Sequence, residues 1–330
     1  MNRSVSLNLT LALVSAAVLV IACLFGSSDL SGFEAISALF GQANARAEII
    51  VYEIRMARAL AAFGVGAALG ASGALLQGLL RNVLADPGVL GVSASASLGA
   101  VIAIYFGLSA YWAFATPVMA ILFALGAMAI LLAASATGLG TIQLILAGVG
   151  LSSFAGALTA LAINLSPNPF ALSDLITWML GSVANRSFLD LSFALPFWLI
   201  GGGLAVLTLP GLRALSLGDE TAISLGVNLK RLRGLVILST ALLTGGAIAI
   251  AGVIGFVGII APHVLRPFVH HDPARLVLPS ALLGGALLTL TDLLIRVAPL
   301  DQELRLGVMA ALIGAPVFVW IAIRTRGIGQ

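Results

Sequence analysis

Apolar residues occur in this chain in long runs, and short stretches between them collect the charged residues, glycine and proline. A run of roughly 20 apolar residues is long enough to cross a bilayer as a helix. The pattern predicts ten helices, near residues 7–27, 58–80, 92–107, 112–135, 141–165, 191–209, 231–251, 253–268, 276–297 and 307–323. We expect the eighth to be short and broken at Pro262.

The predicted fold is an all-α membrane protein, with about ten transmembrane helices in one bundle and a single transmembrane domain over residues 1–330. Hydrophobic residues make up 60% of the chain and charged residues 9%, and the mean hydropathy is +1.14. Residues 87–173, a run of 87, include no Asp, Glu, Lys or Arg. A charge at the centre of a span costs about 2.5–3.5 kcal/mol, so this run has room for three spans and their turns. Helices are expected because they satisfy their own backbone in lipid.

The positions of lysine and arginine predict the orientation in the membrane. With ten helices and an inner N-terminus, ten of the 16 basic residues fall at inner helix ends and six at outer ends. Cytoplasmic loops carry the excess of basic residues, so both termini are expected in the cytoplasm. The sequence pI of 9.6 is then a signal of topology, and no nucleic-acid partner is expected.

The first predicted helix has two interpretations. Residues 20–23, which end in Cys23, resemble a bacterial lipoprotein cleavage box, and Arg3 would then belong to the positive region of a signal peptide. The alternative is an uncleaved first span in which Cys23 is a small apolar residue. We expect the uncleaved span, because nine further spans need no separate export signal. A single cysteine also excludes an intrachain disulfide and a cysteine-rich metal site.

Residues 211–233 form the most polar segment. They include six charged residues: Arg213, Asp219, Glu220, Lys230, Arg231 and Arg233. Ser216 and Asp219 have the spacing of a capping box, Gly226 suits a helix C-terminus, and Asn228 can cap a second helix. The segment therefore predicts a short helix, a glycine stop and the basic start of the next helix. Such a hairpin has no use inside lipid, and we expect a cytoplasmic surface made for another protein.

The chain has few residues for chemistry of its own. Lys230 is the only lysine and does not follow the Gly-Lys-Ser/Thr pattern that cradles ATP. Gly66 and Gly70 have the GxxxG spacing of helix packing. None of the three histidines has a carboxylate or cysteine at metal-ligand spacing. We therefore expect no bound cofactor, no metal and no enzymatic activity in this chain.

Asp292 is the one acidic residue predicted inside a span. A buried ionisable group is a functional candidate, for example as a proton relay. Arg296 lies one helical turn further on, at the spacing at which two such side chains pair. We expect the pair in preference to the relay.

Several blocks together resemble a known family. They are Arg55 with Arg58, residues 70–78 and 81–91, the 217–227 hairpin, residues 255–258 and 262–266, Asp292 with Arg296, and residues 313–316. In length and block order the chain is similar to the permease family of bacterial ABC importers for iron chelates, haem and vitamin B12. It departs from the family pattern at Ala57, Val83 and Arg305, where proline is usual; at Val83 this leaves a turn less stiff.

The resemblance implies an importer of the bacterial inner membrane, embedded in the lipid bilayer. It would consist of two copies of this permease, a cytoplasmic ABC ATPase dimer that uses ATP, and a periplasmic substrate-binding protein. The family's coupling helices, which sit in a groove of the ATPase, correspond here to Leu217, Gly218, Ala222, Leu225 and Gly226. Arginines that receive acidic groups of the binding protein correspond to Arg55, Arg58 and Arg296. The inner gate corresponds to Asn82, Leu84 and Thr141.

Within this family a ferric siderophore is the first expectation for the cargo, followed by haem and cobalamin. Two other functions remain open. An ion-coupled secondary transporter would require intramembrane acidic residues and repeated halves, and the sequence offers one such residue and no convincing repeat. A membrane scaffold would leave the outer arginines and the inner hairpin without a joint purpose.

Overall fold

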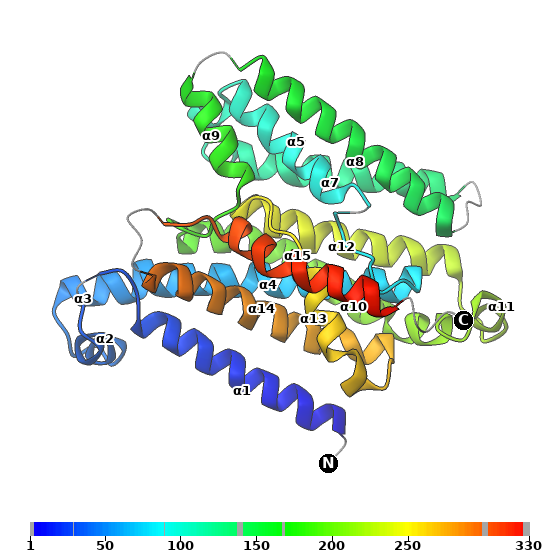
Figure 1. The fold of residues 1–330 in the computed structure, drawn as a ribbon, viewed down its shortest axis with the longest axis horizontal. Helices are drawn as coiled ribbons and strands as arrows, with labels where there is room; N and C mark the ends of the chain where they lie inside the picture. The colour runs from blue at the N-terminus through cyan, green and yellow to red at the C-terminus, as the bar shows by residue number, and fades with distance from the viewer. Residues whose placement is uncertain are drawn as a thin grey trace.

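The computed structural model describes residues 3–28, 30–88, 90–136, 141–166, 169–298 and 303–325, and every regular element among them is helical (Figure 1). The longer helices are α1 (Arg3–Leu24), α4 (Ala57–Leu80), α5 (Val92–Tyr105), α7 (Ala115–Ala136), α8 (Thr141–Asn164), α10 (Phe188–Leu215), α12 (Leu229–Ala251), α14 (Pro273–Val297) and α15 (Leu306–Thr325). The shorter ones are α2 (Gly32–Leu39), α3 (Ala45–Ile49), α6 (Leu108–Tyr111), α9 (Pro169–Met179), α11 (Asp219–Ser224) and α13 (Val257–Leu265). A π-helical segment, Ile50–Met56, leads into α4, and a 3₁₀ turn, Arg266–Val269, follows α13.

Each of the ten predicted segments coincides with one of these helices. In the described residues seven helices are long and apolar enough to cross a membrane, and three shorter apolar helices accompany them. The eighth helix is short, as predicted, and is α13. The predicted break at Pro262 is wrong, because α13 continues through this residue to Leu265 and only then passes into the 3₁₀ turn. The fold is thus all-helical in the described residues and suited to a membrane. The exact number of spans and the side on which each terminus lies stay predictions.

The centre of the bundle is formed by α4, which packs along α14 and α12. Small residues let the first pair approach closely. A β-carbon on Gly66 would lie 2.2 Å from the carbonyl oxygen of Gly284, and one on Gly70 would lie 2.2 Å from that of Ser280. The two glycines therefore act in helix packing, as their spacing predicted.

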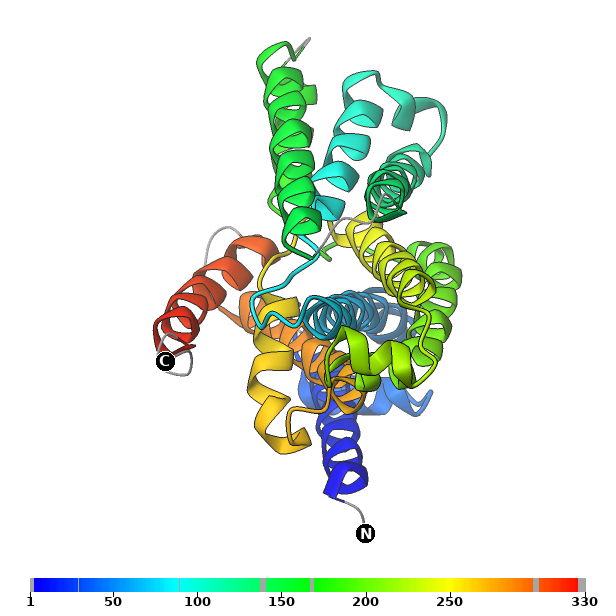
Figure 2. The ribbon, with the colours of Figure 1, turned by 90° about the vertical axis from the view of Figure 1, so that its right-hand side faces the viewer.

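Two helices stand apart from this centre. Figure 2 shows green α8 and red α15 at the edge of the bundle, away from the blue and yellow central helices. Large apolar side chains on both are exposed, among them Leu146 and Phe154 on α8 and Leu312 and Val319 on α15. These faces are available to lipid or to another protein.

The sequence pattern missed α9 and the start of the helix that contains α4. Helix α9 has 11 residues, too few for a span, and includes Asp174. The segment Ile50–Met56 contains Glu53 and Arg55, which made it look like a loop. Both misses have one physical reason: length and apolarity predict spans, whereas these segments are held by packing against neighbouring helices.

Candidate functional site

The inner hairpin has the shape that the sequence predicted. Helix α11 begins after Gly218, whose φ is 108°, and ends before Gly226, whose φ is 85°. The Asn228 side-chain oxygen accepts a hydrogen bond of 2.9 Å from the Arg231 backbone N–H and caps α12. Figure 1 shows α11 projecting from the end of the bundle opposite α2 and α3.

The predicted capping box at Ser216 is wrong. Ser216 is the C-cap residue of α10, and its hydroxyl donates a hydrogen bond of 2.7 Å to the Arg213 carbonyl. Gly218 occupies the N-cap position of α11 instead. The spacing misled because α10 continues to Leu215, so the serine ends one helix rather than starting the next.

Four of the five predicted coupling residues lie at the surface of the hairpin or close to it. Leu217 and Leu225 are 64% and 63% exposed, and both glycines lie beside them. Ala222 is the exception. It lies on the side of α11 that faces the bundle and is fully buried, so it cannot contact another protein there. Ile223, which the sequence analysis did not select, is 57% exposed. Clustered exposed apolar side chains at a polar end of the molecule are typical of an interaction surface.

Ion pairs surround the hairpin. Asp219, the first residue of α11, lies 2.5 Å from Arg81 at the end of α4 and 3.4 Å from Arg233 on α12. A second acid, Asp272, pairs with Arg213 at 3.0 Å. The polar segment 211–233 is therefore attached by ion pairs to the end of α4 and to the start of α14.

The segment that follows α4, residues 81–88, contains the predicted gate residues Asn82 and Leu84. We call it the gate loop. The Asn82 side-chain oxygen accepts a hydrogen bond of 3.0 Å from the Leu84 backbone N–H, so these two residues form one turn. Thr141 is the first residue of α8, and its side chain lies outside the described part of the structure. The gate assignment stays a prediction.

Asp86 holds the gate loop against α13. One carboxylate oxygen accepts a hydrogen bond of 2.8 Å from the Gly88 backbone N–H. The other lies 2.8 Å from the position that a β-carbon on Gly258 would take. Burial raises the pKa of the Asp86 carboxyl above its usual value, because the charged form loses hydration.

Two of the three outer arginines, Arg58 and Arg296, bind Asp292, whereas Arg55 binds the end of α1; we call the three together the outer arginine cluster. Arg58 donates hydrogen bonds of 3.0 and 2.8 Å to Asp292 and also pairs with Glu303. Arg296 lies 3.0 Å from the other oxygen of Asp292. The predicted pairing of Asp292 with Arg296 is therefore confirmed.

Most of this outer arginine cluster is buried, contrary to the picture of docking arginines on a surface. Asp292 is 1% exposed, Arg55 4% and Arg296 7%. Arg55 donates hydrogen bonds to the carbonyl oxygens of Cys23 and Leu24, at 3.3 and 2.5 Å. Contact of Arg55 with a partner would break these bonds. Arg58, which pairs with the more exposed Glu303, is the member of the cluster nearest the surface. The docking role itself stays a prediction.

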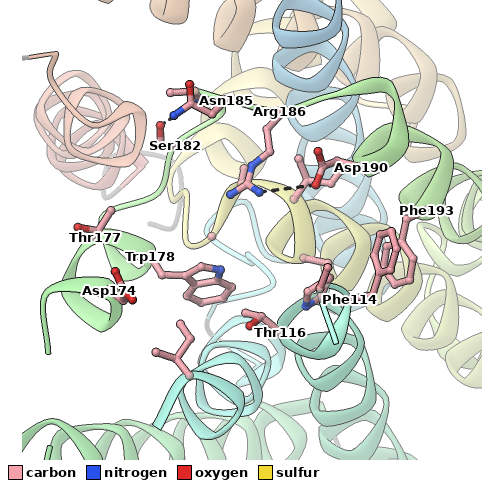
Figure 3. Close-up of a pocket in the computed structure, with 18 of the residues that line it drawn as sticks. Phe114, Thr116, Asp174, Thr177, Trp178, Ser182, Asn185, Arg186, Asp190 and Phe193 are labelled. Atoms are coloured by element: carbon pink, nitrogen blue, oxygen red, sulfur yellow. Dashed lines mark hydrogen bonds and ion pairs between the residues drawn. The ribbon is translucent and has the colours of Figure 1, made fainter. Parts of the chain in front are cut away.

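A pocket of about 490 Å³ opens between α5, α7, α9 and α10 (Figure 3). Arg186 extends into it and lies 3.7 Å from Asp190, and Trp178 and Asp174 of α9 line another side. Asp190 also completes a capping box with Ser187 at the start of α10. The sequence pattern did not point to these residues. Asp174 carried a signal, since it is the first charge after the 87-residue uncharged run.

Comparison with known proteins agrees with the resemblance seen in the sequence. The model of the FecCD transport family matches residues 13–324. The uncharacterised ABC transporter permease YvrB of Bacillus subtilis is 40% identical over 286 residues, which are 85% of this chain and 80% of the relative. The vitamin B12 import system permease BtuC of Vibrio cholerae is 39% identical over 94% of this chain and 91% of the relative. The Fe(3+)-citrate import system permease YfmD of Bacillus subtilis is 34% identical over 92% of this chain and 90% of the relative.

A solved structure gives the same result for the fold. It is described as an inward-facing conformation of a metal-chelate type ABC transporter, with a TM-score of 0.86, 31% identity and coverage of 97% of this chain and 99% of that one. The chain belongs to the FecCD transport family. With its several apolar helices it is a multi-pass ABC importer permease.

Proposed function

We propose that this chain is the translocation subunit of an ATP-driven importer that carries an iron chelate across the bacterial inner membrane. A ferric siderophore is the first choice of cargo, and haem and cobalamin are the alternatives. The observation that carries the proposal is the hairpin around α11, an apolar surface at the inner end of a chain without an ATP motif. Relatives named for vitamin B12 and for Fe(3+)-citrate support a bulky metal chelate.

Energy would arrive through a cytoplasmic ABC ATPase dimer, each subunit of which receives one hairpin. Leu217, Ile223 and Leu225 supply exposed apolar area on a helix of six residues. Burying such area in a groove stabilises a complex by about 25 cal/mol per Å² before the costs of association are subtracted. The charged residues around the hairpin keep the same surface soluble when the ATPase is absent.

The pathway would lie between two copies of this chain, with α8 and α15 facing the second copy. On α8, Gly150 and Gly156 have open space around them. Small residues at a helix surface support close helix–helix contact in lipid. An apolar groove of about 600 Å³ between the end of α9, the break at residues 252–256 and α15 opens on the same side. A wide, largely uncharged wall suits a bulky chelate.

A periplasmic binding protein would dock at the outer end. The outer arginine cluster contains three guanidinium groups and two carboxylates, Asp292 and Glu303, which leaves it with excess positive charge. Such a cluster attracts an acidic surface and sets the orientation of docking, even where most of its members are buried. In this arrangement Arg58 would make the contact and the other two arginines would support it.

The proposal is tested by reconstituting the full chain in liposomes with its ATPase and binding protein. Uptake of radiolabelled ferric siderophore, haem and cobalamin is measured with ATP, with a non-hydrolysable analogue, and with an imposed proton or sodium gradient. We expect uptake of one chelate only when ATP is hydrolysed and the binding protein is present. Uptake driven by an ion gradient without the ATPase would instead identify a secondary transporter.

A further inference from the structure

Arg81 has an unusual backbone conformation at the start of the gate loop. It is the C-cap residue of α4, and its φ of 48° and ψ of 35° lie in the left-handed region. A β-carbon disfavours this region, which glycine adopts freely. An arginine at such a position indicates that its side chain supplies something that glycine could not.

That side chain reaches the inner hairpin. The Arg81 Nη2 atom lies 2.5 Å from an oxygen of Asp219, which is the first residue of α11. The two residues are 138 positions apart in the chain. The other oxygen of Asp219 accepts a hydrogen bond of 3.4 Å from Arg233. One carboxylate therefore joins α11 to the gate loop and to the start of α12.

Hydrogen bonds order both halves of the gate loop. The turn at Asn82 and the hydrogen bond from the Gly88 N–H to Asp86 fix its two halves. At the far side, the Ser152 hydroxyl of α8 donates a hydrogen bond of 3.0 Å to the Gly88 carbonyl. Direct contacts thus run from α11 through Arg81 and the loop to α8.

We propose that the Arg81–Asp219 ion pair transmits displacement of α11 to the gate loop, which makes Arg81 a positioning residue of the transport cycle. The inference rests on the proposed function, in which an ATPase binds and moves α11. The Arg81 and Asp219 side chains are in direct contact, and Arg81 immediately precedes Asn82 in the chain. A shift of α11 therefore pulls directly on the loop. The loop then moves against α8, the helix that would line the pathway.

A purely stabilising role explains the pair less well. The side chains of Arg81 and Asp219 are 45% and 35% exposed, and exposed ion pairs contribute little to folding. A pair kept for stability would also not require an arginine in the left-handed region. Replacement by glycine would relieve the backbone there.

This difference supplies the test. The full chain, in complex with its ATPase, carries a single cysteine at the gate loop through Val83→Cys and Cys23→Ala. Its rate of labelling by a water-soluble maleimide is measured without nucleotide and with ATP plus vanadate. With Arg81 present, we expect nucleotide to change the rate severalfold. In Arg81→Gln and in Arg81→Gly most of this change should disappear, although the ATPase still copurifies.

A matched control and a rescue make the result specific. Arg213→Gln breaks the neighbouring ion pair with Asp272, which does not involve the gate loop, and should leave the nucleotide response intact. Exchange of the charges, Arg81→Asp with Asp219→Arg, should restore the response. The exchange is made in an Arg233→Gln background, because Arg233 would repel the new arginine.

The outcomes separate this inference from the function on which it rests. A full response in Arg81→Gln and Arg81→Gly, with the ATPase bound, would overturn the inference and leave the proposed function standing. The same holds if charge exchange fails to restore the response in an assembled complex, or if nucleotide leaves the rate unchanged while Arg81 is present. Failure of the chain with Arg81 to bind the ATPase would overturn both.

Discussion

The two ends of the molecule use the same side chains in opposite ways. At the outer end, the arginines of the outer cluster are largely buried and donate to backbone carbonyls at the end of α1 as well as to carboxylates. At the inner end, Arg81, Arg213 and Arg233 pair with Asp219 and Asp272 near the surface of a short hairpin. Burial decides the difference. Removing one partner of a buried ion pair leaves an unpaired buried charge, which greatly lowers the free energy of unfolding. In an exposed pair, water solvates the remaining charge and the loss is small.

The lesson is that arginine at a helix end does not by itself indicate a docking surface. The outer cluster fixes α1, α4 and α14 to one another, and the inner pairs lie around a short hairpin near the surface. Substitutions at the two ends test this contrast.

Asp292→Asn should have the largest effect. It leaves two buried guanidinium groups, those of Arg58 and Arg296, without their shared carboxylate. Breaking a buried pair by removing one partner typically costs about 3–5 kcal/mol. We expect a large fall in the thermal unfolding temperature of the detergent-solubilised protein. A melting curve that matches the unmodified chain would show that the cluster does not fix the bundle.

Arg55→Gln should have an intermediate effect. Arg55 donates to Cys23, Leu24 and Ser28, and glutamine is too short to reach all three acceptors. Each buried acceptor left without a partner typically lowers the free energy of unfolding by about 1–3 kcal/mol. The matched control is Arg46→Gln, at an exposed position, which should melt like the unmodified chain. Equal melting of the two variants would contradict the structural role of Arg55.

Asp86→Asn should give a smaller, pH-dependent gain. Asparagine keeps the oxygen that accepts from Gly88 and removes the charge. Because burial raises the folded pKa of Asp86 above its unfolded value, the protonated form favours folding and this advantage is lost as pH rises through the folded pKa. The variant should therefore melt higher than the unmodified chain at neutral pH, and the difference should shrink as pH falls through the folded pKa and be absent below the unfolded value of roughly 3.9. A difference that grows on acidification would have the wrong sign.

Asp272→Asn should have the smallest effect and is the inner counterpart of Asp292→Asn. Its ion pairs with Arg213 and Arg275 involve exposed arginines, and asparagine can still cap α14 through the hydrogen bond from the Ala274 N–H. Exposed pairs contribute about 0–1 kcal/mol. We expect a melting temperature close to that of the unmodified chain. A loss as large as that of Asp292→Asn would remove the contrast between the two ends.

The hairpin shows how far local signals reach. Gly226 and Asn228 end one helix and start the next, as the sequence predicted, because turn and cap preferences depend on a few adjacent residues. Ser216 failed as a cap because packing carried α10 further than its apolar run suggested. Ala222 was wrong as a contact residue because α11 packs on the bundle with this residue turned inward. Neither outcome is encoded within the hairpin itself.

The membrane class, the ten helical segments, the polar hairpin and the family could all be predicted from the sequence. These follow from apolar length, the absence of charge and local turn chemistry, which act between near neighbours. Three features could not be predicted: Arg55 and Arg296 are buried, α9 lines a pocket, and Arg81 meets Asp219 across 138 positions. These depend on which helix faces meet. In a chain this uniformly apolar, close packing at small residues such as Gly66 and Gly70 sets those faces, and hydrophobicity alone does not.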